Sequence, residues 1–170
     1  MEIGSELVTT ADISSDSGTI ELESQTSLSL FNGNAVSTGD ANIRIDAEDA
    51  LTVSMISAGI GSVSLEGESV ADSGDTDTDV SAGSLRLVAT SPIGSLGAPD
   101  NPLEIDVETL AAQTGSGGIF ITETGDLVID TVSTLFVNRV GPDGSAAPGV
   151  SLSALEDLNA SGTILLQTLD

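Results

Sequence analysis

The segment from Asp75 to Asp79 reads Asp-Thr-Asp-Thr-Asp, and it is the strongest candidate for chemistry in the sequence. Its carboxylates at Asp75, Asp77 and Asp79 stand at alternate positions. A loop that curls around a hard cation can bring such carboxylates together, so we name these three residues as candidate Ca²⁺ ligands. A solvated acidic loop between two coils is the simpler interpretation of the same residues, and it is the one we favour.

The acidic segment does not follow the known calcium-loop patterns. Counted from Asp75, an EF-hand loop would need glycine at its sixth position and glutamate at its twelfth. Val80 and Arg86 stand there instead. The glycine-rich nonapeptide of calcium-binding β-rolls is also missing. A calcium site in this segment would therefore be of another type.

Composition excludes several classes of function. The 170 residues include 27 acidic and 3 basic ones, which gives a formal net charge of −24, and there is no histidine or cysteine. All three basic residues are arginines, Arg44, Arg86 and Arg139. This composition therefore excludes catalytic sites that need histidine or cysteine, zinc sites built from those residues, and a P-loop, which needs a lysine. Nucleic acid would be repelled by this charge.

Paired carboxylates could in principle hydrolyse a glycosidic bond. The acidic residues near predicted strands are Glu21, Glu23, Asp46, Glu48, Asp49, Glu66, Glu68, Glu104, Asp106 and Glu108. Nothing in their spacing distinguishes one pair from another. We therefore name no catalytic and no cofactor-binding residues, and we expect the protein not to be an enzyme.

Short alternations of apolar, polar and apolar residues recur along the chain, and alternation with period two is typical of a β-strand. The first four begin 23, 20 and 22 residues apart, and a small residue or turn former precedes each. The alternations are Ile20–Leu22, Ile43–Ile45, Val63–Leu65, Leu85–Leu87 and Ile119–Ile121. A second short apolar pair follows several of them after about eight residues, which indicates a repeating unit of short strands and polar turns.

A repeat of 20–23 residues built from such short strands predicts a solenoid rather than a sandwich. A sandwich would need longer strands and tight hairpin turns, whereas Asn32-Gly33 is the only Asn-Gly pair. No sustained helical stripe is present. We therefore predict an all-β, single-stranded parallel β-helix, or β-solenoid, of about seven coils that spans residues 1–170 as one segment.

Stacking the repeats predicts an inward column of aliphatic side chains, and it places Arg44 beside Glu21 as an exposed pair that helps to fix the register. The alternation 103–107 falls in the long gap before the last repeat, where we expect an extra rung or a side strand. The predicted column consists of Ile20, Ile43, Val63, Leu85 and then Ile119.

The run from Gly83 to Glu123 resembles the repeats of very large bacterial surface proteins, the filamentous-haemagglutinin-like adhesins and large repetitive proteins. The motifs that carry the resemblance are Ile93-Gly94, Asn101-Pro102-Leu103, Leu110-Ala111-Ala112 and Gly118-Ile119-Phe120-Ile121. The resemblance covers about a quarter of the chain. It implies a right-handed parallel β-helix, secretion to the bacterial cell surface, and a role as stalk or adhesive surface, and it transfers no catalytic residues.

We therefore expect a scaffold or stalk segment of a longer repetitive chain, because the last residues, 162–168, resemble the first repeat at 18–24. The expected partners are neighbouring repeats or a second copy bound end to end, with no nucleic acid and no insertion into a membrane. An alternative is a carbohydrate-binding β-helix that grips cell-surface glycans through loops 88–102 and 141–149. A polysaccharide-active β-helix enzyme is a second alternative.

Overall fold

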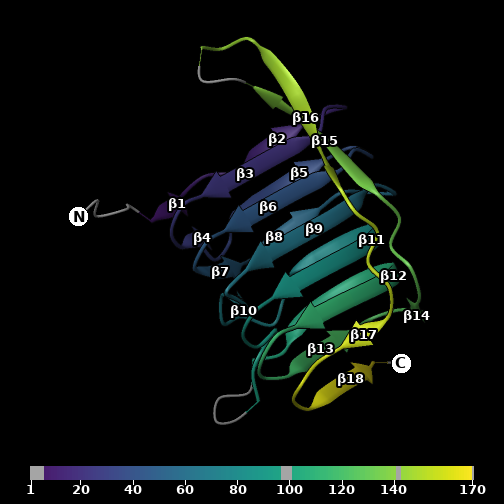
Figure 1. Ribbon diagram of the computed structural model, residues 1–170. Helices are drawn as coiled ribbons and strands as arrows, with labels where there is room; N and C mark the ends of the chain where they lie inside the picture. Colours follow the sequence, from purple (N-terminus) through teal and green to yellow (C-terminus); the bar gives the residue numbers. More distant parts are fainter. Residues whose placement is uncertain (1–5, 97–100, 141–142, 170) are drawn as a thin grey trace.

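A computed structural model describes residues 6–96, 101–140 and 143–169, and it confirms the predicted β-solenoid (Figure 1). Within these residues the chain forms 18 strands and no helix. No helix of the described chain is therefore long and apolar enough to cross a membrane. All pairings between successive turns are parallel, as expected where each turn stacks on the one before.

Each complete turn crosses three faces of the solenoid in the same order. The first face is a sheet whose neighbouring strands come from successive turns. Its strands are β1 (Leu7–Thr9), β4 (Leu28–Leu30), β7 (Ala50–Val53) and β10 (Ser69–Asp72). A bridge at Ile93 continues this face in the next turn, and β13 (Ile119–Glu123) and β18 (Ile164–Thr168) start on it and run on into the second face.

The second and third faces merge into one large sheet because two long strands run across both. These long strands are β11 (Val80–Ala89) and β12 (Leu103–Thr114). The second face also holds β2 (Ile13–Ser15), β5 (Ala35–Thr38) and β8 (Met55–Ser57). The third face also holds β3 (Ile20–Ser24), β6 (Ile43–Ala47), β9 (Ser62–Gly67), β14 (Val128–Ile129) and β17 (Leu158–Asn159).

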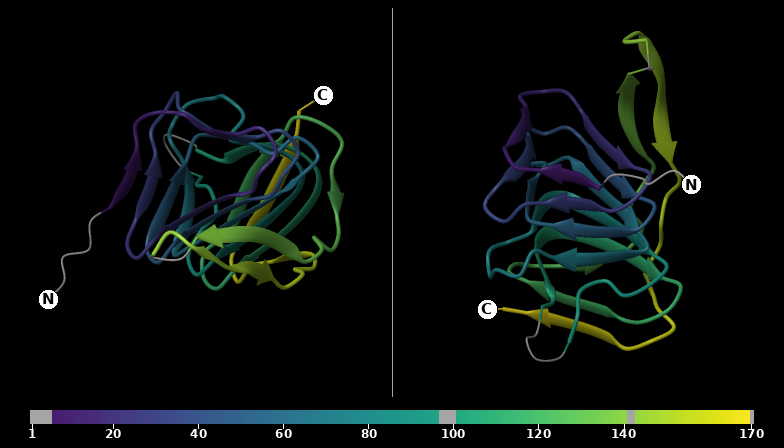
Figure 2. Two further views of the ribbon diagram at one scale, coloured as in Figure 1. Left: turned by 90° about the horizontal axis from the view of Figure 1, so that it is seen from above. Right: turned by 90° about the vertical axis from the view of Figure 1, so that its left-hand side faces the viewer.

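The solenoid has about five turns, fewer than the seven predicted. The difference arises because the chain leaves the coil after β14 and forms an antiparallel hairpin before it returns at β17. The hairpin strands are β15 (Leu135–Val140) and β16 (Ala146–Leu152). In Figure 2 the hairpin projects past the N-terminal turn.

The predicted aliphatic column is confirmed over its first four members. Ile20, Ile43, Val63 and Leu85 pair in register on the third face, and all four are buried. The prediction for the fifth member of the column, Ile119, is wrong, because Leu85 pairs with Leu110 and not with Ile119. Ile119 pairs instead with Ile93 and Ile164 on the first face.

The long gap before Ile119 contains a full turn, which explains the error. The alternation 103–107 is the start of β12, a rung whose two halves lie on the second and third faces. It is therefore part of the stack and not a side strand. Residues 162–168 resemble residues 18–24 in sequence, but the two segments do not occupy the same position within a turn. Ile164 lies on the first face and Ile20 on the third.

The hairpin covers the outer side of the third face and forms a second, small apolar layer there (Figure 2). Four residues are buried although they lie outside the solenoid core: Ala111, Val132, Leu135 and Val137.

The pair of Glu21 and Arg44 was predicted to be exposed to solvent. It is present, but the Arg44 side chain is almost completely covered.

The column on the third face gives a test of the core. Ile43 has no exposed surface, whereas Ile60 is 80% exposed on the side of the solenoid. Ile43→Ala should lower the free energy of unfolding by about 2–5 kcal/mol, because it removes apolar contacts and leaves a cavity. The matched Ile60→Ala change should lie within about 0.5 kcal/mol of wild type. Urea denaturation followed by circular dichroism measures both, and equal stability of the two variants would refute the assignment of the core.

Candidate functional site

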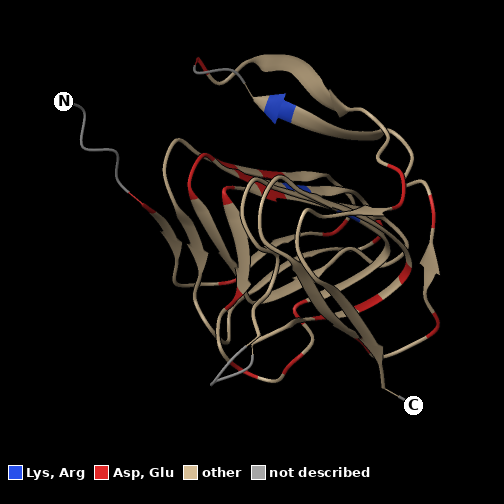
Figure 3. Ribbon diagram, turned by 60° about the horizontal axis from the view of Figure 1, so that its bottom comes forward, with Lys and Arg blue, Asp and Glu red and all other residues tan. Residues whose placement is uncertain are grey.

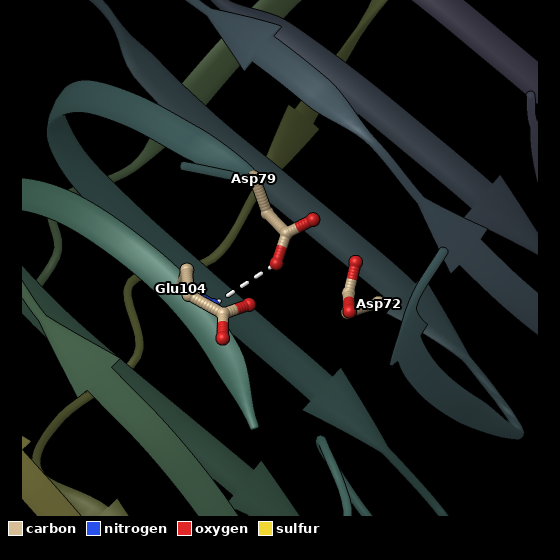
Figure 4. Close-up of side chains that lie close together, drawn as sticks. All are labelled: Asp72, Asp79 and Glu104. Atoms are coloured by element: carbon tan, nitrogen blue, oxygen red, sulfur yellow. Dashed lines mark hydrogen bonds between the residues drawn. The ribbon is translucent and has the colours of Figure 1, made fainter. Parts of the chain in front are cut away.

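Three carboxylates from two turns converge at the corner between the first and second faces (Figure 4). Asp72 is the last residue of β10, Asp79 directly precedes β11, and Glu104 is the second residue of β12 in the following turn. One oxygen from each of the three side chains lies within 4.8 Å of the others. We call this group the carboxylate cluster.

A long corner loop and the register of the turns bring these residues together. At the same corner one turn earlier, Ser54 alone joins β7 to β8, whereas loop 73–78 and Asp79 join β10 to β11. Gly74, the second residue of this loop, has a φ of 96°, and its N–H donates to Asp72 Oδ2 at 2.9 Å. Such a left-handed position suits glycine, because an L side chain would be strained there.

The backbone of the next turn then fixes Asp79 against Glu104. The Asp79 N–H donates to the Glu104 carbonyl oxygen at 2.8 Å, and the Glu104 N–H donates to Asp79 Oδ2 at 3.0 Å. Asn101 adds a bond to the corner, since its Nδ2 donates to the Asp72 carbonyl oxygen at 3.1 Å. The cluster is therefore held by contacts between the fourth and fifth turns.

Each carboxylate of the cluster keeps one buried oxygen without a hydrogen-bond partner. These atoms are Asp72 Oδ1, Asp79 Oδ1 and Glu104 Oε2. Asp72 is 5% exposed and Asp79 is 1% exposed, so bulk water does not solvate them freely. Buried polar atoms without partners are uncommon in folded proteins, and each one needs a physical explanation.

Burial makes ionisation of the cluster unfavourable. The pKa of Asp79 is raised to about 10, chiefly by burial; the negative charges of Asp72 and Glu104 act in the same direction, and the hydrogen bond from the Glu104 N–H opposes them. Burial also raises the pKa of Glu104, and the charge of Asp72 acts in the same direction. Without a bound cation, the corner therefore holds at least one proton at neutral pH.

No arginine neutralises the cluster, because all three form ion pairs elsewhere. Arg44 pairs with Glu21 at 2.8 Å and also with Asp46. Arg86 Nη1 lies 3.4 Å from Glu66 Oε2. Arg139, on the hairpin, lies 2.6 Å from Glu21 and also bonds Glu23. Figure 3 shows basic segments on the hairpin and on the strands beneath it.

The Glu21 carboxylate fastens the hairpin to the first turn. Its two oxygens accept from Arg139 Nε at 2.8 Å and Nη2 at 2.6 Å, and these bonds, with the nearby charges of Arg139 and Arg44, lower the pKa of Glu21. The Asn138 N–H also donates to Thr19 Oγ1 at 2.8 Å. An open cleft of about 710 Å³ remains between the hairpin and β3.

Of the three predicted calcium ligands, the structure brings only Asp79 into the carboxylate cluster. Asp75 Oδ2 accepts from Ser73 Oγ and Asp75 Oδ1 accepts from the Asp77 N–H, both at 2.8 Å. Asp77 is exposed to solvent. Asp75 and Asp77 thus stabilise the loop and lie outside the cluster, while Asp72 and Glu104 take part in it.

The sequence carried one usable signal for Asp72. It follows Val70 at the inward spacing of an alternating strand, and it pairs with the buried Val53 of the preceding turn. An acidic residue at an apolar position of a column marks a place where burial needs compensation. Glu104 was one of ten acidic candidates and had no such signal.

The proposed glycan-binding loops are described only in part. Residues 97–100 and 141–142 of loops 88–102 and 141–149 lie outside the described residues. A comparison of the chain with protein-family models, curated proteins and solved structures returned no match.

The buried carboxyl of Asp79 predicts how stability depends on pH when no cation is bound. Its pKa in the folded state, about 10, lies above its ordinary value of 3.8, so the folded state binds more protons and stability falls as pH rises between these values. Each unit of pH should cost at most about 1.4 kcal/mol for this one proton. Asp72, Glu104 and Asp75 are the acidic groups that act on the corner.

Urea denaturation between pH 5 and 8, in the presence of a chelator, measures this dependence. Asp79→Asn should flatten it and make the protein more stable at pH 8, because the amide needs no proton to become neutral. Asp77→Asn makes the same change of charge at an exposed position and should keep the wild-type slope. Identical slopes in the two variants would show that Asp79 does not hold the proton.

Proposed function

We propose that this chain is a structural segment of a secreted, filamentous-haemagglutinin-like bacterial surface protein, in which it serves as scaffold or stalk. The observation that supports this most directly is the stack itself, whose strands continue in register from turn to turn and end in unpaired edges. A stack of this kind is extended by adding turns, as in other solenoid proteins.

The two ends of the stack are apolar, as a surface that receives another turn should be. At the C-terminal end, β18 pairs with β13 and with no other strand of the described residues, and Ile164 is 42% exposed. At the N-terminal end, β4 is the one partner of β1 within the part of the chain that the structure describes, and Leu7 and Val8 are 37% and 45% exposed. Edge strands with exposed apolar residues readily pair with another chain.

The sides of the solenoid are mainly acidic, with single exposed apolar side chains such as Ile60 among the charges. The chain carries a formal net charge of −24, and its acidic residues are spread over the outer surface and the turns (Figure 3). Like charges on neighbouring rods oppose association side by side. Contact between units is therefore directed to the ends, which is the behaviour a stalk requires.

The protein should associate end to end at high concentration, and more strongly in 0.5 M sodium chloride than at low salt, because salt screens the repulsion between acidic units. Sedimentation velocity over a range of concentrations measures this. Ile164→Asp places a charge at the open end and should shift the protein to monomer. Ile60→Asp makes the same change on the side of the rod and should not.

Circular dichroism should show that both variants keep the wild-type content of β-structure. A protein that stays monomeric at all concentrations in high salt would contradict association through the ends. Equal loss of association in the two variants would instead point to contacts along the sides.

A further inference from the structure

We propose that Asp72, Asp79 and Glu104 form a binding site for a divalent cation of the calcium class, which links the fourth turn of the solenoid to the fifth. This site differs from the loop site that the sequence predicted, since it omits Asp75 and Asp77. It is also independent of the proposed scaffold function, because a chain that never associates could still bind the ion.

The spacing of the cluster suits a calcium ion. Oxygen ligands surround Ca²⁺ at about 2.3–2.6 Å, so two oxygens on opposite sides of the ion lie about 5 Å apart. The three cluster oxygens lie within 4.8 Å of one another. All three donors are carboxylate oxygens. Hard cations such as Ca²⁺ prefer oxygen ligands of this kind more strongly than softer metals such as zinc do.

The unpartnered atoms give an independent reason for a ligand at this point. Asp72 Oδ1, Asp79 Oδ1 and Glu104 Oε2 are buried without hydrogen bonds, and the first two belong to side chains that are at least nine-tenths buried. In Figure 4 the three carboxylates surround a common space. A single cation in that space would satisfy oxygens that no donor of the described chain reaches.

Charge favours the same conclusion. Three carboxylates meet in this corner, and the three arginines of the chain form their ion pairs with Glu21, Glu23, Asp46 and Glu66. Buried carboxylates become stable when they are protonated, paired with a base or coordinated to a metal. Coordination of one divalent cation is the state that offsets most of the charge of all three ionised carboxylates at once.

A bound ion would join parts of the chain that are held otherwise by backbone hydrogen bonds. Asp72 and Asp79 stand at the two ends of corner loop 73–78, and Glu104 stands in the next turn. The ion would therefore close the loop and clamp the two turns at one point. Water or further oxygens of the loop would complete the coordination shell, as is usual for Ca²⁺.

Isothermal titration calorimetry with calcium chloride tests the site on the full chain, after treatment with a chelator and at matched ionic strength. Wild type should bind about one Ca²⁺ per chain with saturation. Asp79→Asn and Glu104→Gln should each weaken binding at least about tenfold, because each removes one charged ligand. Asp77→Asn, with the same loss of charge outside the cluster, should stay within about twofold of wild type.

Thermal unfolding provides the second readout, because a ligand that binds only the folded state raises the melting temperature. Calcium should raise it in wild type and Asp77→Asn at high sodium chloride, and it should not in Glu104→Gln. If Asp79→Asn does not fold, Asp72→Asn replaces it. No saturable binding to wild type, or an equal calcium effect in all variants, would overturn the site. Loss of binding in Asp77→Asn with full binding in Glu104→Gln would move the site to the loop.

Discussion

The parallel pairing of each turn with the next, in register, is the interaction on which the rest of this structure depends. Each rung has only two to six residues on a face, too few to be stable alone, so backbone bonds and side-chain packing between turns must supply the stability. The columns of isoleucine, leucine and valine follow from this requirement. Ile43, for example, is fully buried because Ile20 and Val63 pair with it on either side.

The same stacking decides where charge can be placed. Outward positions of successive turns lie side by side, so like charges there would repel, and Arg44 next to Glu21 relieves that repulsion. The hairpin uses this arrangement a second time, because Arg139 reaches the same Glu21 from outside. A chain with three basic residues thus places two of them on one glutamate. The hairpin is thereby attached to the solenoid at the point where Glu21 already pairs with Arg44.

Local spacing was enough to predict the third face, because Ile20, Ile43, Val63 and Leu85 recur at nearly constant intervals. The same spacing gave a wrong prediction for Ile119. The residues between Leu85 and Ile119 include β12, which crosses two faces without a break and forms an additional turn. Asp79 was found among the candidate ligands, but its partners were not. Asp72 and Glu104 meet it only after the length of loop 73–78 and the stacking of two turns are known. Likewise Arg139 and Glu21 are 118 residues apart, beyond the range of any local pattern.

The carboxylate cluster interrupts a core that is mainly aliphatic, and its position explains why the fold tolerates it. Asp72 pairs with Val53, so a charged side chain stands where the preceding turn has a buried apolar one. An apolar residue there would hold the turns together by packing alone. Carboxylates from both turns can hold together only when a proton or a cation lies between them, because their own charges repel. Hydrophobic packing fixes the register of the fourth and fifth turns along the strands, where Leu85 pairs with Leu110, as it does between the earlier turns. At this one corner, by contrast, the contact between the two turns depends on the composition of the surrounding solution.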